Sequence, residues 1–190
     1  MPDSDKRLLI YEALELRSEY DAQIETLRKC LPESRNSSRA SLLERADGGA
    51  YRPADGVDPT KLRREIRALE HKRHKLNAAI QAANFTNTVH VGGEEVTLAE
   101  ALELRKATNT RIGELGSQLV RSAVVRVVHK EDRDIEEAPD VSFGDARREL
   151  QEAREEFRRL NRALREASYR VAVDFTDEPD RHGEAGAHKT

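Results

Sequence analysis

The sequence predicts an all-α protein: a duplicated helical hairpin that forms an elongated four-helix bundle or coiled coil, with short accessory β-strands. Charged residues make up 36% of the 190 residues and aromatic residues only 4%, a composition typical of long charged helices with a thin apolar seam. Apolar residues recur at helical spacing in four long segments. The motif EALELR occurs twice, at residues 12–17 and 100–105.

The first helical segment is predicted from about Asp5 to Leu31, where apolar residues recur every three or four positions. Pro32 ends it, because the residue before a proline is disfavoured in the helical conformation. Residues 33–58 are rich in Ser, Gly, Asp and Arg and predict a long connection.

The second helix begins at Asp58-Pro59, an N-cap residue followed by proline at the first helical position. Its seam keeps a heptad spacing throughout when Arg73 is counted as a seam residue. Residues 88–97 then alternate apolar and polar side chains around Gly92-Gly93. That pattern predicts a small β-hairpin.

The third helix is expected to start at Thr97, because Glu100 completes a capping box with it. After this helix, residues 124–129 are rich in β-branched side chains and predict a strand. Residues 131–140 are acidic and contain Pro139, so we expect a loop there.

Ser142 is the expected N-cap of the fourth helix, whose seam again follows a heptad spacing. Residues 169–175 alternate and predict an edge strand. The polar tail 177–190 is expected to be disordered.

The repeat extends beyond the EALELR motif. An offset of 88 residues maps Ile24 onto Ile112, and an offset of 84 maps Leu76 onto Leu160. We therefore divide the chain into a first hairpin unit, residues 1–97, and a second, residues 98–176. Neither unit can bury its seam alone, so the two are expected to pack face to face.

Three stretches carry a family resemblance: the EALELR opening, residues 83–87 (ANFTN) followed by Gly93 and residues 97–102 (TLAEAL), and the closing helix with Leu160-Asn161. Together they resemble the septicolysin-like family of small bacterial helical proteins, over roughly Leu9 to Phe175. Ser168-Tyr169 departs from the Asn-Trp step of that family. The resemblance implies a helical fold and, through the family name, cytolytic activity.

Polar residues on or beside the seams are the candidate binding residues. Arg17 and Arg105 occupy equivalent places in the two EALELR motifs, and Asp21, one turn after Arg17, is its expected partner. The cluster is either an anion or small-ligand site or a polar layer that fixes helix register, and the polar layer is the favoured interpretation. Its members are Arg17, Asp21, Asn77, Arg105, Asn109 and Asn161.

Charge is unevenly distributed along the chain. Residues 61–77 hold seven basic and two acidic side chains, whereas residues 131–140 hold six acidic side chains and Arg133. We expect the two segments to face each other, within the chain or between copies, and nucleic-acid or anionic-membrane binding is the alternative. The expected contact residues are Arg63, Arg64, Arg67, Asp132, Asp134, Glu136 and Glu137.

No enzymatic motif stands out, and neither a cofactor nor a metal is expected. His71 and His74 have ligand spacing, but Lys72, Arg73 and Lys75 surround them and repel a cation. The lone cysteine, Cys30, indicates a reducing compartment.

The sequence shows neither a secretory signal nor an apolar run long enough to span a bilayer. We therefore expect a soluble cytoplasmic protein that is non-enzymatic and acts through self-assembly, as a dimer or higher homo-oligomer, and through contact with another protein. A pore-forming cytolysin is the first alternative. Nucleic-acid binding through residues 61–77 is the second, and it is disfavoured because the net charge is −3 and the chain has no tryptophan for base stacking.

Overall fold

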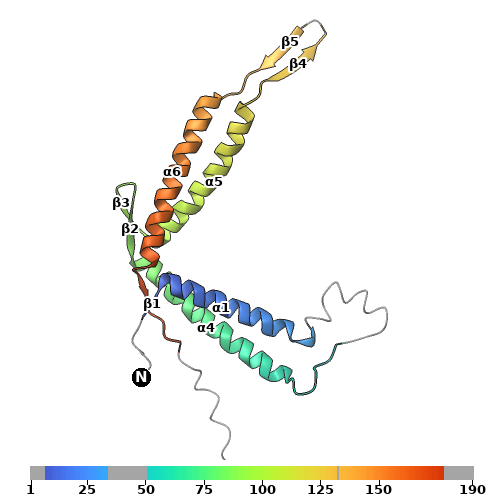
Figure 1. Ribbon diagram of the computed structural model, residues 1–190, viewed down its shortest axis with the longest axis vertical. Coiled ribbons are helices and arrows are strands. Elements are labelled where there is room, and N and C mark those ends of the chain that lie inside the picture. Colours follow the sequence, from blue (N-terminus) through green and yellow to red (C-terminus); the bar gives the residue numbers. More distant parts are fainter. Residues whose placement is uncertain (1–6, 34–50, 132, 178–190) are drawn as a thin grey trace, which may run out of the picture. The chain divides into compact units, whose positions relative to one another are not determined.

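The computed structural model describes residues 7–33, 51–131 and 133–177 (Figure 1). The described chain is mostly helical with short antiparallel strands, as predicted. Most of the predicted connection 33–58 and almost all of the tail 177–190 lie outside the described residues. The elements are β1 (Leu8–Leu9), α1 (Ile10–Lys29), α4 (Pro59–Thr86), β2 (Thr88–Val91), β3 (Glu94–Thr97), α5 (Leu98–Ser122), β4 (Arg126–Lys130), β5 (Arg133–Glu137), α6 (Phe143–Ser168) and β6 (Ala172–Val173).

The chain divides into two compact units. Unit 1 comprises Met1–Ala83 and Val171–Thr190, and unit 2 comprises Asn84–Arg170. The boundary therefore falls within α4 and not between residues 97 and 98. It does so because the β2–β3 hairpin packs on α5 and α6, and because β6 pairs with β1. Packing of the two hairpins as a four-helix bundle stays a prediction.

Helices α4, α5 and α6 begin where the predicted caps place them. The Thr60 backbone N–H donates to the Asp58 carboxylate at 2.8 Å, and this bond lowers the pKa of Asp58. Thr97 and Glu100 form a reciprocal capping box at the start of α5. The Ser142 hydroxyl accepts the backbone N–H three residues later, at the start of α6. Each bond satisfies a helix N–H that has no partner within the helix.

Unit 1 pairs α1 with α4 (Figure 1). The seam between them consists of side chains that both helices bury, and the short β1–β6 sheet adds Val173 to this core. Leu76 is 0% exposed. The buried residues of this core are Ile10, Ala13, Tyr20, Ile24, Ile66, Leu76, Ile80, Ala83 and Val173.

Unit 2 pairs α5 with α6 through Leu115, Leu150 and Ala153, with Ile112 and Leu119 packed against them (Figure 1). Buried alanines on both helices have small side chains, which favours close helix packing. The β2–β3 hairpin turns at Gly92 and Gly93, whose φ angles of 62° and 94° suit glycine.

The two units share the same arrangement at the start of their first helices. The Leu9 backbone N–H donates to Glu12 at 2.7 Å, and the Thr97 N–H donates to Glu100 at 2.8 Å. Position 97 is 88 residues after position 9, and position 100 is 88 residues after position 12. The offset found in the sequence therefore relates two equivalent hydrogen bonds.

The strand pairing is equivalent as well. Leu8 pairs with Val173 in the β1–β6 sheet, and Val96 pairs with Val89 in the β2–β3 sheet. Offsets of 88 and 84 residues relate the two pairs, and both Val173 and Val89 are buried. In each unit, the strand that leads into the first helix is thus paired with a valine that follows the second helix of the other unit.

Two predicted elements need correction. The first helix begins at Ile10 and not at Asp5, because Leu8–Leu9 pair with β6. The predicted acidic loop 131–140 is largely strand β5, paired with β4. Across this β4–β5 ribbon, Arg126 faces Glu137 and Val128 faces Ile135, and such pairs stabilise strand pairing, whereas Lys130 faces the like-charged Arg133.

Leu76 and Leu160 provide a matched test of the two seams. They are equivalent in the repeat and are 0% and 2% exposed. We expect Leu76→Ala and Leu160→Ala each to reduce the free energy of unfolding by about 2–5 kcal/mol, because each leaves a cavity. Urea unfolding followed by circular dichroism measures this, with the exposed Phe85→Ala as control. A negligible loss at either leucine would contradict its place in the seam.

Tyr20 gives a pH-dependent test of the unit 1 core. Its hydroxyl is buried without a hydrogen-bond partner of normal geometry among the described residues. Burial, and secondly the nearby Asp177 carboxylate, raises the pKa of Tyr20. An unfolded tyrosine ionises near pH 10 whereas folded Tyr20 stays neutral, so stability is full below about pH 10 and falls above it.

We expect Tyr20→Phe to remove this part of the alkaline destabilisation and, at neutral pH, to leave stability unchanged or raised by about 1 kcal/mol. Thermal melts between pH 7 and 11 measure both effects. A clear loss of stability at neutral pH would show instead that the hydroxyl makes a stabilising bond.

Candidate functional site

Three of the six residues of the predicted polar cluster come together in unit 1, in a groove of about 290 Å³ between α1 and α4. Arg17 and Asp21 reach it from α1, and Asn77 reaches it from α4. Arg73, which the heptad spacing places in the seam, and His74 complete the lining, and neither was among the predicted cluster residues. We call these five residues the polar groove.

Each arginine of the polar groove is held by the facing helix. The half-buried Arg17 donates from Nη1 to Asn77 Oδ1 at 3.2 Å. Arg73 donates from Nη1 to Asp21 Oδ1 at 2.8 Å. Asp21 was the expected partner of Arg17, and the structure pairs it with Arg73 instead. A guanidinium has five N–H donors, and these contacts use one donor on each arginine.

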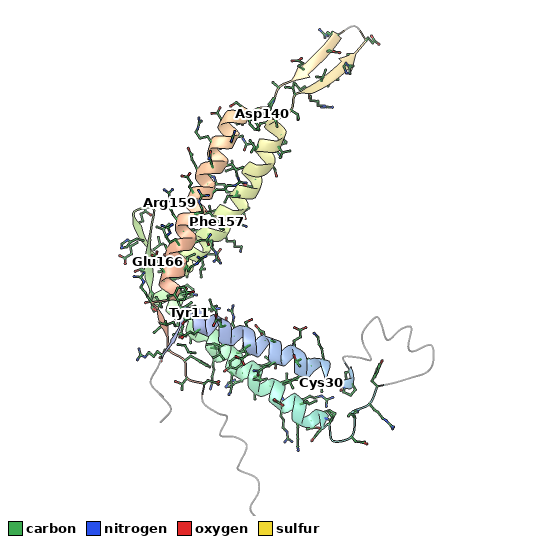
Figure 2. The ribbon with its side chains drawn as sticks, in the orientation of Figure 1. Tyr11, Cys30, Asp140, Phe157, Arg159 and Glu166 are labelled. Atoms are coloured by element: carbon green, nitrogen blue, oxygen red, sulfur yellow. The ribbon has the colours of Figure 1, made fainter. Side chains whose placement is uncertain are left out.

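Unit 2 does not repeat this cluster. Arg105 and Asn109 are exposed, and among the described residues no hydrogen bond or ion pair joins either of them to Asn161. The position equivalent to Arg73 is Phe157, half-buried on α6 (Figure 2). The repeat therefore provides a second version of the same helix pair, with an aromatic side chain in place of the ion pair.

The predicted charged surfaces have local partners. On the basic helix α4, Arg63 forms an ion pair with Glu33, while Arg64 and Arg67 are exposed. On β5, the carboxylate of Asp134 lies 2.6 Å from His129 Nδ1.

The other β5 carboxylates lie close by. Glu137 pairs with Arg126 at 3.0 Å, and Glu136 is exposed. Asp132 lies outside the described residues. The contact expected between the two charged segments stays a prediction.

An exposed apolar surface was missed by the sequence analysis. It lies where α5 ends, the β4–β5 ribbon begins and α6 starts; the ends of the two helices are side by side there (Figure 1). Its side chains are 43–71% exposed. The only signal in the sequence was the run of β-branched residues 124–129, which predicts a strand. This surface, which we call the hairpin tip, consists of Val120, Val124, Val125, Val127 and Phe143.

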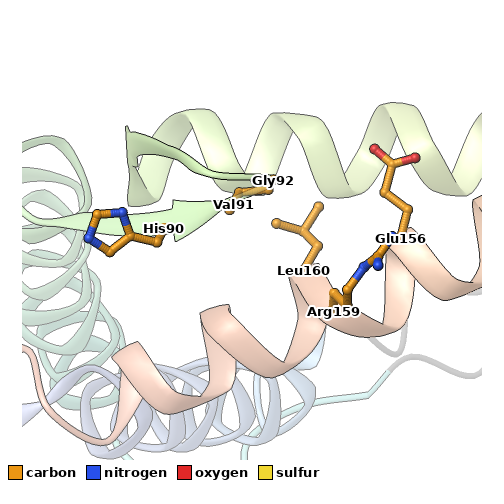
Figure 3. Close-up of a pocket in the computed structure, with 6 residues that line it drawn as sticks. All are labelled: His90, Val91, Gly92, Glu156, Arg159 and Leu160. Atoms are coloured by element: carbon orange, nitrogen blue, oxygen red, sulfur yellow. The ribbon is translucent and has the colours of Figure 1, made fainter.

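A larger hollow of about 650 Å³ lies between the β2–β3 turn and α6 in unit 2 (Figure 3). Its charged lining residues, Glu156 and Arg159, are exposed, as is His90. Within the described parts of the chain, no group of three or more His, Cys, Asp or Glu side chains could hold a metal ion. None of the described helices is long and apolar enough to cross a membrane.

Residues 56–173 match a family of unknown function, DUF6847, and the chain belongs to this family. The crystal structure of a functionally unknown conserved protein from Corynebacterium diphtheriae is similar, with a TM-score of 0.62 and 18% identity. The similarity covers 88% of this chain and 99% of that one, and it concerns the fold alone. No curated protein matches the chain. The resemblance to septicolysin-like proteins stays a prediction.

The repeat suggests a substitution that tests whether the fold needs the polar groove. The double variant Asp21→Asn with Arg73→Phe gives unit 1 the residues that unit 2 carries at the equivalent positions. Because the Asp21–Arg73 pair is partly exposed, it contributes only about 0–1 kcal/mol. We expect the free energy of unfolding of the double variant to stay within about 1 kcal/mol of wild type in urea titrations. A much larger loss would show that the ion pair is a structural requirement.

Proposed function

We propose that this member of the DUF6847 family is a non-enzymatic helical protein that self-associates through the hairpin tip of unit 2. The observation that carries the proposal is the exposure of the five apolar side chains of the tip, up to 71% for Val120. Single exposed apolar residues are common on protein surfaces, whereas several of them gathered at one end of a helix pair favour contact with another molecule.

The β4–β5 ribbon supports the same proposal. The ribbon has only the two strands β4 and β5. Among the described elements, neither strand makes extensive contact with anything except the other strand. A two-stranded hairpin is marginally stable in water unless a further strand or a helix packs against it. A partner that covers Val127 and the adjoining tip would supply this missing layer.

A second copy of the chain fits this surface because the ribbon carries both signs of charge. Strand β4 is basic, with Arg126 and Lys130, whereas β5 carries Asp134, Glu136 and Glu137. A twofold axis can place the basic strand of one copy against the acidic strand of the other. The apolar tip would then be buried at the centre, with charged residues around it.

Substitutions at the tip test this proposal directly. We expect Val120→Ser with Val124→Ser to weaken self-association at least about tenfold, because the pair removes exposed apolar area from the contact. Sedimentation velocity over a concentration series measures the effect, and Phe85→Ser is the control because it removes an equally exposed side chain elsewhere. A strict monomer for the wild-type chain at high micromolar concentration would refute the proposal.

Charge reversal on β5 tests the choice of partner. We expect Asp134→Lys with Glu136→Lys to weaken association at low salt and to matter little near 1 M salt, where screening acts over about 3 Å.

If instead replacing Arg63 and Arg64 abolishes retention on heparin while oligomer size stays unchanged, α4 serves nucleic acid and not assembly.

A further inference from the structure

We infer that the polar groove of unit 1 binds a small molecule through an oxyanionic group, a phosphate or a carboxylate. Two guanidinium groups, an amide and an imidazole line one groove between α1 and α4. Arginine presents planar N–H forks that match the oxygen pairs of phosphate and carboxylate. The inference is independent of self-association at the hairpin tip.

The arginines are fixed in position before any ligand arrives. Arg17 on α1 is held by Asn77 on α4, and Arg73 on α4 is held by Asp21 on α1. Holding a long side chain in place reduces the entropy that binding would otherwise cost. Most N–H donors of both guanidinium groups remain outside these two bonds.

The charge of the polar groove favours an anion. Arg17 and Arg73 carry two positive charges, and Asp21 is the only carboxylate among the lining residues. His74 adds a hydrogen-bonding group without adding negative charge. The excess of one positive charge is left without a counter-charge in the lining.

The size of the groove restricts the ligand. About 290 Å³ lies just below the roughly 300–1,000 Å³ of small-molecule sites. The groove therefore suits a small molecule with one oxyanionic end better than a nucleic acid or a protein segment.

Unit 2 shows that the fold does not demand this cluster. At the equivalent positions it carries Asn109 and Phe157 in place of the Asp21–Arg73 ion pair, and Arg105 is exposed. A polar layer that only fixed helix register would be needed in both helix pairs. The cluster is confined to one of them, which favours a role beyond packing.

Isothermal titration calorimetry at constant ionic strength tests the inference, with inorganic phosphate and succinate as separate probes. We expect saturable binding of at least one probe at a single site, and the probe that binds more tightly identifies the oxyanion. Arg17→Gln and the double variant Asp21→Asn with Arg73→Phe should each weaken binding by about tenfold or more. Arg105→Gln is the matched control, since it removes the equivalent arginine of unit 2, and it should leave binding unchanged.

Three results would overturn the inference. The first is that neither phosphate nor succinate binds the wild-type chain with a dissociation constant below about 10 mM, because weaker binding would not indicate a specific site. The second is that Arg105→Gln weakens binding as much as Arg17→Gln does, since binding would then follow total charge. The third is that the double variant, with a wild-type circular dichroism spectrum, keeps the wild-type affinity.

Discussion

A pair of helices can bury only the stripe along which the two face each other, and this constraint governs the whole chain. Charged residues leave few apolar side chains for a core, so each unit concentrates them in one narrow seam. The β1–β6 and β2–β3 sheets each lengthen that seam by one buried valine, Val173 in unit 1 and Val89 in unit 2. Where the seam of unit 2 ends, the valines of the hairpin tip remain exposed, because no further element of the described chain covers them.

Local features of the fold could be predicted because they depend on neighbouring residues. Asp58, Thr97 and Ser142 act as caps through bonds to backbone groups two or three residues away. The turn at Gly92-Gly93 is local in the same way. Strand β1 could not be predicted, because its partner β6 lies at the other end of the chain. Strand β5 was missed because its charges resemble a solvated loop until their partners on β4 are known.

Only three of the five residues of the polar groove were predicted, and their pairing was not. Heptad spacing indicated that Arg17, Asp21 and Asn77 lie near the seam, and the structure brings all three to one groove. Spacing along one helix does not say which residue of the other helix lies opposite. For this reason Asp21 was assigned to Arg17 on its own helix, whereas the structure pairs it with Arg73 on α4. The repeat also suggested a symmetric cluster, and Phe157 shows that equivalent backbone positions need not keep equivalent chemistry.

Two of the small sheets join strands from the two halves of the chain. The first half, from β1 to β2, and the second, from β3 to β6, each contribute one strand to two of the three small sheets: β1 pairs with β6, and β2 pairs with β3. Neither of these two sheets is complete within one half, whereas the β4–β5 sheet lies wholly in the second half. A chain cut at the Gly92-Gly93 turn would yield two fragments, each offering the strands that the other lacks. Two identical half-length chains would meet the same requirement by exchanging strands.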